Sequence, residues 1–167
     1  MIGITLEKMQ ISQLERMSAL ARKIFKEHYD PIVGAETNDY MIEKYQSASG
    51  IANEVECGAQ YFFVRHNGQD IGIVATDVKS KYMYLSKFYL AKEFRGHGYS
   101  REMMNFVENQ AIENGLNRIR LNVNAGNFNT IETYRHFGFE IVEELQKDVG
   151  GGYSVHDYVM ERKLSKA

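Results

Sequence analysis

The sequence has one cysteine, one proline and no tryptophan. With Cys57 alone, no intrachain disulfide can form and no cluster of thiolates is available for a zinc site, so we expect no metal. We interpret Cys57 as a small, partly buried side chain. The chain also lacks an apolar run of about 20 residues, the length needed to span a bilayer. Residues 1–17 carry acidic and polar side chains where a secretory signal would need an apolar segment. We therefore expect a soluble protein of the reduced cytoplasm, with no membrane partner.

An excess of charge of one sign is missing as well. The chain carries 20 lysines and arginines against 22 aspartates and glutamates, a formal net charge of -2. Without a basic field, nucleic acid is not an expected partner. The 167 residues, 44% hydrophobic and 25% charged, are typical of one globular domain with a substantial core. Neither a repeat nor a linker divides the chain, so we expect residues 1–167 to form a single domain.

The first third of the sequence has the apolar periodicity of helices. Ser12 precedes Glu15 by three residues, the signature of a capping box, and apolar side chains follow at helical spacing. Pro31 and Gly34 should break this first helix. The elements that we expect here are a strand over residues 2–6, a helix over 12–28 and a shorter helix over 38–46, with residues 51–57 left ambiguous.

From residue 60 onward the pattern alternates as in strands. Strands over 61–66 and 71–78 flank Asn67-Gly68, a favoured hairpin turn. The later elements that we expect are a strand over 82–90, a helix over 100–114 ended by Gly115, a strand over 118–123, a helix from Asn127 or Asn129 to near Phe137, and strands over 139–145 and 153–164. The inward side of the helix over 100–114 should carry Met103, Met104, Val107, Ala111 and Ile112. We interpret Gly150 to Gly152 as a flexible hairpin tip. This order of elements predicts one α+β domain around a mixed sheet.

The most informative stretch is Phe88 to Met104, FYLAKEFRGHGYSREMM. It predicts a strand, a glycine-containing loop from Arg95 to Ser100, and a helix. Glycines let the backbone approach a ligand, the first N–H groups of a helix have no partner in the helix, and Arg95 can contact an anion. The loop therefore indicates a phosphate-bearing ligand, although an ordinary tight turn has the same glycine spacing. The sequence is neither a P-loop nor the dinucleotide fingerprint, because Gly-Lys-Ser/Thr and the third glycine are missing.

A second motif, VNAGNFNTIETYRHFGF from Val123 to Phe139, follows after one helix and one strand. In this order the two motifs resemble the GNAT superfamily of N-acetyltransferases. In that family, an Arg/Gln-x-x-Gly-x-Gly/Ala loop binds the pyrophosphate of acetyl-coenzyme A, and a later helix carries Asn, Ala-Ile, Tyr and Gly-Phe. The matching positions are Arg95, Gly96, Gly98 and Ser100 in the loop, and Asn127, Thr130-Ile131, Tyr134 and Gly138-Phe139 in the helix pattern. The close match covers residues 87–142.

The resemblance implies a GNAT-like α+β fold, a central mixed and mostly antiparallel sheet of about seven strands with about four helices packed on both faces. It implies an enzyme that transfers acetyl from acetyl-coenzyme A to a primary amine. Tyr134 would be catalytic, as the hydroxyl donor to the departing thiolate. The residues implied to bind the cofactor are Phe88, Tyr89, Leu90, Arg95, Gly96, His97, Gly98, Tyr99, Ser100, Asn127 and Asn129. Asn127 also fits a helix cap, and both roles stay open.

Two positions depart from the family pattern. Ser100 stands where Gly or Ala is usual, and its small hydroxyl is compatible with phosphate binding. Ser86 stands where many members carry a glutamate that is discussed as the general base. Because a serine cannot take a proton from an amine unaided at neutral pH, the sequence does not identify the base.

The segment from Glu27 to Glu56 suggests a class of acceptor. It contains seven acids, Glu27, Asp30, Glu36, Asp39, Glu43, Glu54 and Glu56, against one base, Lys44, with Tyr29, Tyr40 and Tyr45 interleaved. An electronegative rim would suit a small-molecule amine such as a polyamine, as in bacterial polyamine acetyltransferases, while a solvated helix face is the simpler interpretation. Acetylation of a protein N-terminus or lysine, and a non-catalytic sensor of acyl-coenzyme A, are alternatives. A homodimer is left open.

Overall fold

The computed structural model describes residues 3–165, apart from the side chain of Lys147. Its strands are β1 (Thr5–Lys8), β2 (Gln60–His66), β3 (Gln69–Val78), β4 (Met83–Leu90), β5 (Arg118–Asn124), β6 (Glu140–Gly150) and β7 (Tyr153–Lys163). The α-helices are α1 (Leu14–Val33), α2 (Ala35–Tyr45), α3 (Ala48–Glu56), α4 (Tyr99–Glu113) and α5 (Phe128–His136), with 3-10 turns η1 (Ile11–Gln13) and η2 (Lys92–Phe94). The predicted α+β fold is confirmed. The helix beyond the expected four is α3, which occupies the ambiguous segment.

The strands form one sheet in the order β1-β2-β3-β4-β5-β7-β6. Neighbouring strands are antiparallel except β4 and β5, which are parallel. That parallel pair is short, because only Met83 with Ile119 and Tyr84 with Arg120 are in register. Beyond Tyr84, the C-terminal half of β4 therefore has no ladder with β5, and its backbone is free to face a ligand.

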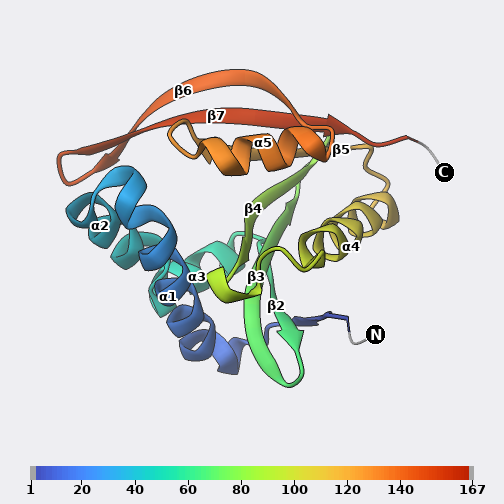
Figure 1. Ribbon diagram of the computed structural model, residues 1–167, viewed down its shortest axis with the longest axis horizontal. Helices are drawn as coiled ribbons and strands as arrows, with labels where there is room; N and C mark the ends of the chain where they lie inside the picture. Colours follow the sequence, from blue (N-terminus) through green and yellow to red (C-terminus); the bar gives the residue numbers. More distant parts are fainter. Residues whose placement is uncertain (1–2, 166–167) are drawn as a thin grey trace.

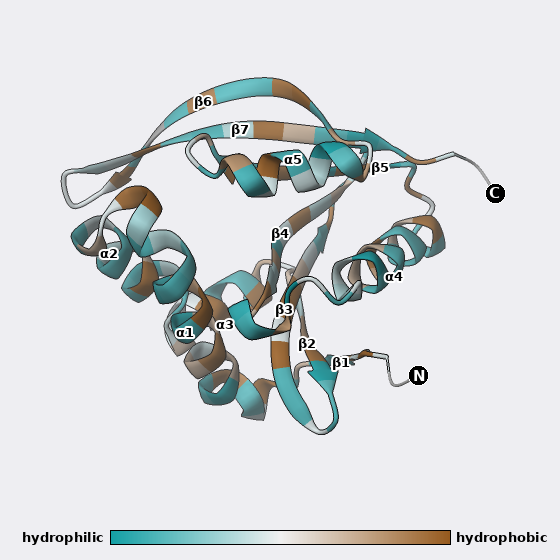
Figure 2. Ribbon diagram, viewed as in Figure 1, coloured by the Kyte–Doolittle hydropathy of each residue, from teal (hydrophilic) through white to brown (hydrophobic). Residues whose placement is uncertain are grey.

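Two hydrophobic clusters hold helices against the two faces of the sheet. One contains inward residues of α4 and α5, among them Met103, Met104 and Ile131. The other contains inward residues of α1 and α3, among them Met17 and Ile51. Figure 1 shows α4 and the group α1 to α3 on opposite sides of β2 to β4, and Figure 2 shows apolar and polar stretches alternating along these helices. Each helix buries one apolar stripe against the sheet, and this burial positions the helices on its two faces.

Several predicted details of the helices are wrong. Helix α1 begins at Leu14 after η1, and the capping box there joins Gln10 and Gln13 rather than Ser12 and Glu15. The helix also runs through Pro31 and ends at Gly34, whose φ is 88°. Proline removes only one N–H, and here the loss falls in the last turn, so the helix persists to the glycine.

Two residues are more exposed than expected. Ile112 of α4 is 45% exposed, whereas Met103, Met104, Val107 and Ala111 are buried as predicted. Cys57 is exposed because it is the C-terminal cap of α3. The predicted strand over 2–6 overlaps β1 only at residues 5 and 6, because β1 begins at Thr5; Ile2 lies outside the described residues.

The tip of the β6–β7 hairpin is docked on α2 rather than projecting as a flexible turn (Figure 1). The hydroxyl of Tyr40 and Nζ of Lys44 donate to the Val149 carbonyl, at 3.1 and 2.5 Å. A Cβ at Gly151 would lie 2.6 Å from Cε1 of Tyr40, so glycine is needed there for the close approach as well as for its φ of 62°. We name this contact between Tyr40 and the tip the clasp. Within residues 3–165, no helix is long and apolar enough to cross a membrane.

Candidate functional site

The loop between β4 and α4 has the geometry of an anion site. Gly96 and Gly98 have φ of 81° and 82°, and Gly98 is the N-cap of α4. The first N–H groups of any helix have no partner within the helix, and at α4 no capping side chain satisfies them either. A Cβ built on Gly96 or Gly98 would meet no atom within 4 Å. The space beside the loop is therefore open to a ligand, and the helix N-terminus favours a negative one.

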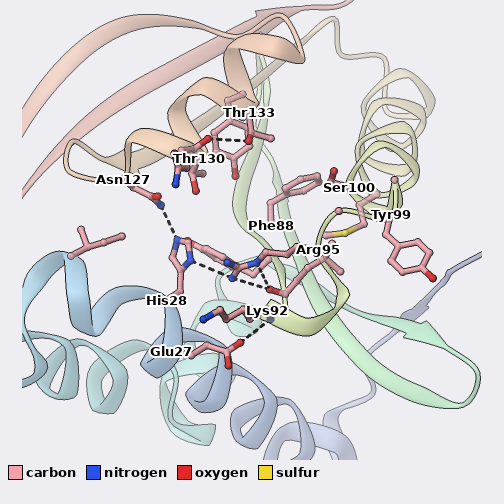
Figure 3. A pocket seen from close by; sticks show the side chains of 18 of the residues that line it. Glu27, His28, Phe88, Lys92, Arg95, Tyr99, Ser100, Asn127, Thr130 and Thr133 are labelled. Carbon is pink, nitrogen blue, oxygen red and sulfur yellow. Dashed lines mark hydrogen bonds between the residues drawn. The ribbon is translucent and has the colours of Figure 1, made fainter.

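A cavity of about 500 Å³, named here the loop cavity, lies beside this loop. Its walls come from α1, the end of β4, the loop, the start of α4, and α5 with the residue before it (Figure 3). Of the residues predicted to bind the cofactor, every one except His97 lines the cavity, and so does Tyr134. His97 is exposed. Tyr99 contributes through its backbone, because its ring points away from the cavity in Figure 3 and its hydroxyl lies 3.3 Å from Nε2 of His66.

His28 of α1 is a site residue that the sequence did not reveal. Its Nδ1 lies 3.3 Å from Nη2 of Arg95, and its Nε2 lies 2.9 Å from Nδ2 of Asn127 (Figure 3). Burial, followed by the charge of Arg95, lowers the pKa of His28, so the ring is neutral at pH 7. It thus joins α1, the loop and α5 across the cavity. These contacts span 67 and 99 residues of sequence, which no local motif encodes.

The structure shows one of the two predicted roles of Asn127 to be missing, the helix cap, and leaves the cofactor contact a prediction. Asn127 occupies the N-cap position of α5, yet its side chain makes no capping bond. The residue is 4% exposed and lines the loop cavity. Its amide is therefore directed toward the cavity rather than to the helix, and the first N–H groups of α5 also lack a side-chain cap.

Tyr134 is both a core residue and a residue of the cavity. It is 6% exposed, and its ring packs near Phe88 and Phe139, with centroids 6.0 and 5.6 Å away. Burial raises its pKa, so the hydroxyl stays protonated at neutral pH. Among the described residues, no hydrogen bond engages this hydroxyl, which leaves it available as a donor to a ligand.

Backbone donors lie close by on β4. The N–H of Ala91 donates to the Ile71 carbonyl on β3 at 2.8 Å. Successive N–H groups of a strand point to opposite edges, so those of Phe88 and Leu90 point away from β3, into the gap before β5. The N–H and C=O of one strand residue point to the same side. The Leu90 carbonyl agrees with this direction, because it accepts from Nε and Nη2 of Arg95, at 3.3 and 3.2 Å, and Arg95 lies in the loop rather than on β3.

A second cavity, of about 290 Å³, lies between α1, α2, α3 and strands β4, β5 and β7. We name it the tyrosine cavity because Tyr29, Tyr45, Tyr84 and Tyr89 line it. Tyr89 lines both cavities, and its hydroxyl lies 2.6 Å from that of Tyr29. Burial raises the pKa of Tyr29 to about 12 and holds the pKa of Tyr89 well above its usual value, so both phenols are neutral.

The position expected to hold a base carries Ser86, whose hydroxyl donates to the Ala75 carbonyl at 3.2 Å. The pairing of β3 with β4 shifts by one residue here, which is a bulge, and Lys87 then lines the tyrosine cavity together with Ser86. Nζ of Lys87 lies 3.2 Å from Oε1 of Glu54 and contacts the Tyr61 hydroxyl. Lys87 is 5% exposed, and this burial lowers its pKa.

Most of the acidic segment is paired within the protein. Lys26 bonds Asp30 and Asp39, Arg22 bonds Glu43, and the Tyr153 hydroxyl donates to Glu36. Of the seven acids, Glu54 lines the tyrosine cavity, where Asp157 of β7 is the other carboxylate. Glu27 lines the loop cavity. Because these acids are paired, the electronegative rim predicted for residues 27–56 is weaker than the count of acids indicated. Within the described residues, no cluster of His, Cys, Asp and Glu could hold a metal ion.

Comparisons with known proteins agree with this geometry. The model of the acetyltransferase (GNAT) family matches residues 18–139. Among solved structures, the PaiA N-acetyltransferase of Thermoplasma acidophilum in complex with coenzyme A has 22% identity and a TM-score of 0.79, over 97% of this chain and 99% of that chain. Naa50 of Arabidopsis thaliana in complex with the bisubstrate analogue CoA-Ac-MVNAL has 19% identity and a TM-score of 0.70, over 98% and 100% of the chains.

A GNAT family acetyltransferase of Elizabethkingia anophelis with acetyl-CoA bound has 13% identity and a TM-score of 0.67, over 97% and 99% of the chains. No curated protein matches the sequence significantly. Since the family model covers most of the chain, and the fold agrees along nearly all of it, the chain belongs to the acetyltransferase (GNAT) family and is an acetyl-coenzyme A-dependent N-acetyltransferase.

Proposed function

We propose that this protein acetylates the primary amine of a small cationic molecule, with acetyl-coenzyme A in the loop cavity and the amine in the tyrosine cavity. The observation that carries the proposal is that the two cavities meet at one residue of β4, Tyr89. A thioester and an amine placed in them would approach each other at the open half of this strand.

The residues of the loop cavity fit the cofactor. The open space beside Gly96 and Gly98 and the uncapped start of α4 suit its diphosphate, and Arg95 adds a positive charge. Bound there, acetyl-coenzyme A supplies the acetyl group as a thioester. The N–H groups of Phe88 and Leu90 are the donors that would stabilise charge on the carbonyl oxygen. The Tyr134 hydroxyl would donate to the sulfur as it becomes a thiolate.

An amine with a pKa of about 10.4 must lose a proton before it can attack at pH 7. We assign this step to Lys87 and Glu54, which line the tyrosine cavity. The neutral Nζ of Lys87 would accept the proton of the substrate ammonium, and the Glu54 carboxylate would stabilise the lysine ammonium that forms. Burial lowers the pKa of Lys87, and a base is most effective when its pKa is close to the working pH.

The small volume of the tyrosine cavity favours a small acceptor. Its volume of about 290 Å³ corresponds to roughly ten water molecules of about 30 Å³ each. The clasp joins α2 to the hairpin whose strand β7 forms another wall, so two walls of the cavity are held together. Two carboxylates, Glu54 and Asp157, against Lys87 favour a cationic acceptor, of which a polyamine is one kind.

The test is release of coenzyme A thiol from acetyl-coenzyme A in the presence of spermidine, monoamines, and peptides with a free N-terminus or a lysine. Turnover of the small cationic amines supports the proposal. Turnover of peptides alone would assign a protein substrate and would refute the proposal. If calorimetry detects binding of acetyl-coenzyme A but none of these amines is acetylated, the proposal fails.

A further inference from the structure

His28 of α1 contacts one residue of the loop and one at the start of α5, with its half-buried ring lining the loop cavity (Figure 3). Arg95 has only donors, so Nδ1 of His28 is the acceptor for Nη2 of Arg95, at 3.3 Å. The proton of the neutral ring is then on Nε2, which lies 2.9 Å from the end of the Asn127 amide. An amide can present either terminal atom by a half-turn about its last bond, and Oδ1 is the atom that accepts from Nε2.

The contact with His28 helps to fix the side chain of Arg95. Arg95 is exposed, and an exposed arginine otherwise samples many rotamers. Its Nε and Nη2 donate to the Leu90 carbonyl, and Nη2 also donates to His28. These contacts hold one edge of the planar guanidinium. Among the described residues, no hydrogen bond or ion pair engages Nη1, so the two N–H groups of this nitrogen are left for a ligand.

Asn127 is fixed in a similar way from the side of α5. Its side chain is buried and does not cap the helix. With Oδ1 turned to His28, the Nδ2 group of Asn127 keeps its N–H donors for a ligand. Arg95 and Asn127 both line the loop cavity, one from the loop and one from the start of α5. His28 is the side chain that joins them.

We propose that His28 is a positioning residue for acetyl-coenzyme A, which holds Arg95 and Asn127 in the orientation in which both bind the cofactor. This inference rests on the proposed function only in placing the cofactor in the loop cavity. Ordering a side chain during binding reduces affinity, and His28 orders these two before the cofactor arrives. Because the contacts are equally strong before and during the reaction, they lower the Kd of the cofactor and leave the turnover number unchanged.

Three substitutions of His28 separate its two contacts in calorimetry with coenzyme A. The amide of an asparagine lies near the position of Nδ1 and that of a glutamine near the position of Nε2. His28→Asn therefore keeps an acceptor for Arg95, and His28→Gln keeps a partner for Asn127. His28→Phe loses both contacts but keeps a ring against Tyr29, whose centroid lies 4.7 Å from that of His28. Each of the first two should raise Kd by about two- to tenfold, the effect of ordering one side chain, and His28→Phe by roughly the product.

A double-mutant cycle tests whether His28 acts through Arg95. In a protein that carries Arg95→Met, His28→Gln should have no further effect on Kd, because the contact that it removes is already missing. The matched control is His66→Phe. His66 also joins distant segments, since its Nδ1 lies 3.1 Å from the Gly3 carbonyl oxygen, but it lines neither cavity. This control should leave the Kd for coenzyme A unchanged.

The inference is overturned if His28→Phe binds coenzyme A as the wild type does, or if His28→Gln still weakens binding in the Arg95→Met protein. Kinetics exclude a merely structural role. Because α1 lines both cavities, a displaced α1 would change kcat and the KM of the amine as well, and that result would also reject the inference. Loss of positioning raises the KM of acetyl-coenzyme A alone.

Failure of the proposed function is separable, because the Kd for coenzyme A is measured without an amine. Weakened binding by His28→Phe together with acetylation of peptides alone would reject only the small acceptor. Weakened binding by Gly98→Asp but normal binding by His28→Phe would reject only the role of His28. Normal binding by Gly98→Asp would place the cofactor outside the loop cavity and reject both.

Discussion

Replacing Gly98 by aspartate should abolish cofactor binding in a protein that still folds. Gly98 is the N-cap of α4 with φ of 82°, and a Cβ there would meet no atom within 4 Å. A left-handed backbone costs an L-residue about 1–2 kcal/mol, while an aspartate N-cap exceeds a glycine N-cap by only a few tenths of a kcal/mol. The free energy of unfolding should therefore fall by about 1–2 kcal/mol, which is less than the typical stability of a folded domain, about 5–15 kcal/mol.

The effect on the cofactor should be much larger because the charges repel. Two unit charges about 4 Å apart interact with about 4 kcal/mol at an effective dielectric constant of 20. Since 1.4 kcal/mol corresponds to about a tenfold change in affinity, the Kd for coenzyme A should rise roughly a thousandfold. The added bulk beside the loop acts in the same direction.

Calorimetry with coenzyme A, together with chemical denaturation of the free protein, separates the two effects. Gly98→Asn is the matched control, because asparagine has the shape of aspartate and tolerates positive φ but carries no charge. It should weaken binding by about tenfold or less, on the assumption that shape alone costs about 1 kcal/mol. Equal losses in the two variants, or unchanged binding in Gly98→Asp, would refute the assignment of the diphosphate to this loop.

Three further predictions concern catalysis and stability. Tyr134→Phe should lower turnover by roughly ten- to ten-thousand-fold with little change in cofactor affinity, and near-normal turnover would leave Tyr134 only a packing role. The double variant Lys87→Met/Glu54→Gln removes the assigned base without leaving a buried unpaired charge. Its turnover should fall by a similar factor at pH 7 and recover as the pH approaches about 10.4, where the substrate amine is itself neutral; a loss that persists at high pH would contradict this role. Asp70→Asn should lower the free energy of unfolding at pH 7 by roughly 1–3 kcal/mol, because bonds from Arg16 hold the pKa of Asp70 below its usual value. The difference from wild type, measured by urea denaturation, should shrink as the pH falls below about 3.9, and a constant difference would show that the charge is not the cause.

The local chemistry of the loop and the helices was readable from the sequence. Glycines at positions 96 and 98 have the positive φ that their context indicated, and Gly115, with φ of 73°, ends α4 as expected. The hairpin turn at Asn67-Gly68 has positive φ at both residues. These features depend on residues close together in the chain, and each leaves a signal in residue type and spacing.

What could not be predicted depends on contacts between distant segments. His28 enters the loop cavity because α1 crosses the end of β4, and the rotation of that helix is set by packing rather than by a motif. The docking of the glycine tip depends on Tyr40, more than a hundred residues away. The second carboxylate of the tyrosine cavity, Asp157, lies on a strand whose register alone brings it there.

The acidic segment shows how a count of charges misleads when partners come from elsewhere in the chain. The cations that pair with its acids are Arg22, Lys26 and Lys87, and all three lie outside the segment that was counted. Exposed charges that are paired, and screened beyond about 10 Å at 0.1 M salt, exert little force on an approaching amine. Under the proposed function, discrimination among amines would then occur at short range, inside the tyrosine cavity that Glu54 and Asp157 line. Composition could suggest the sign of the acceptor's charge, but only the folded arrangement shows which acids are paired and which line a cavity.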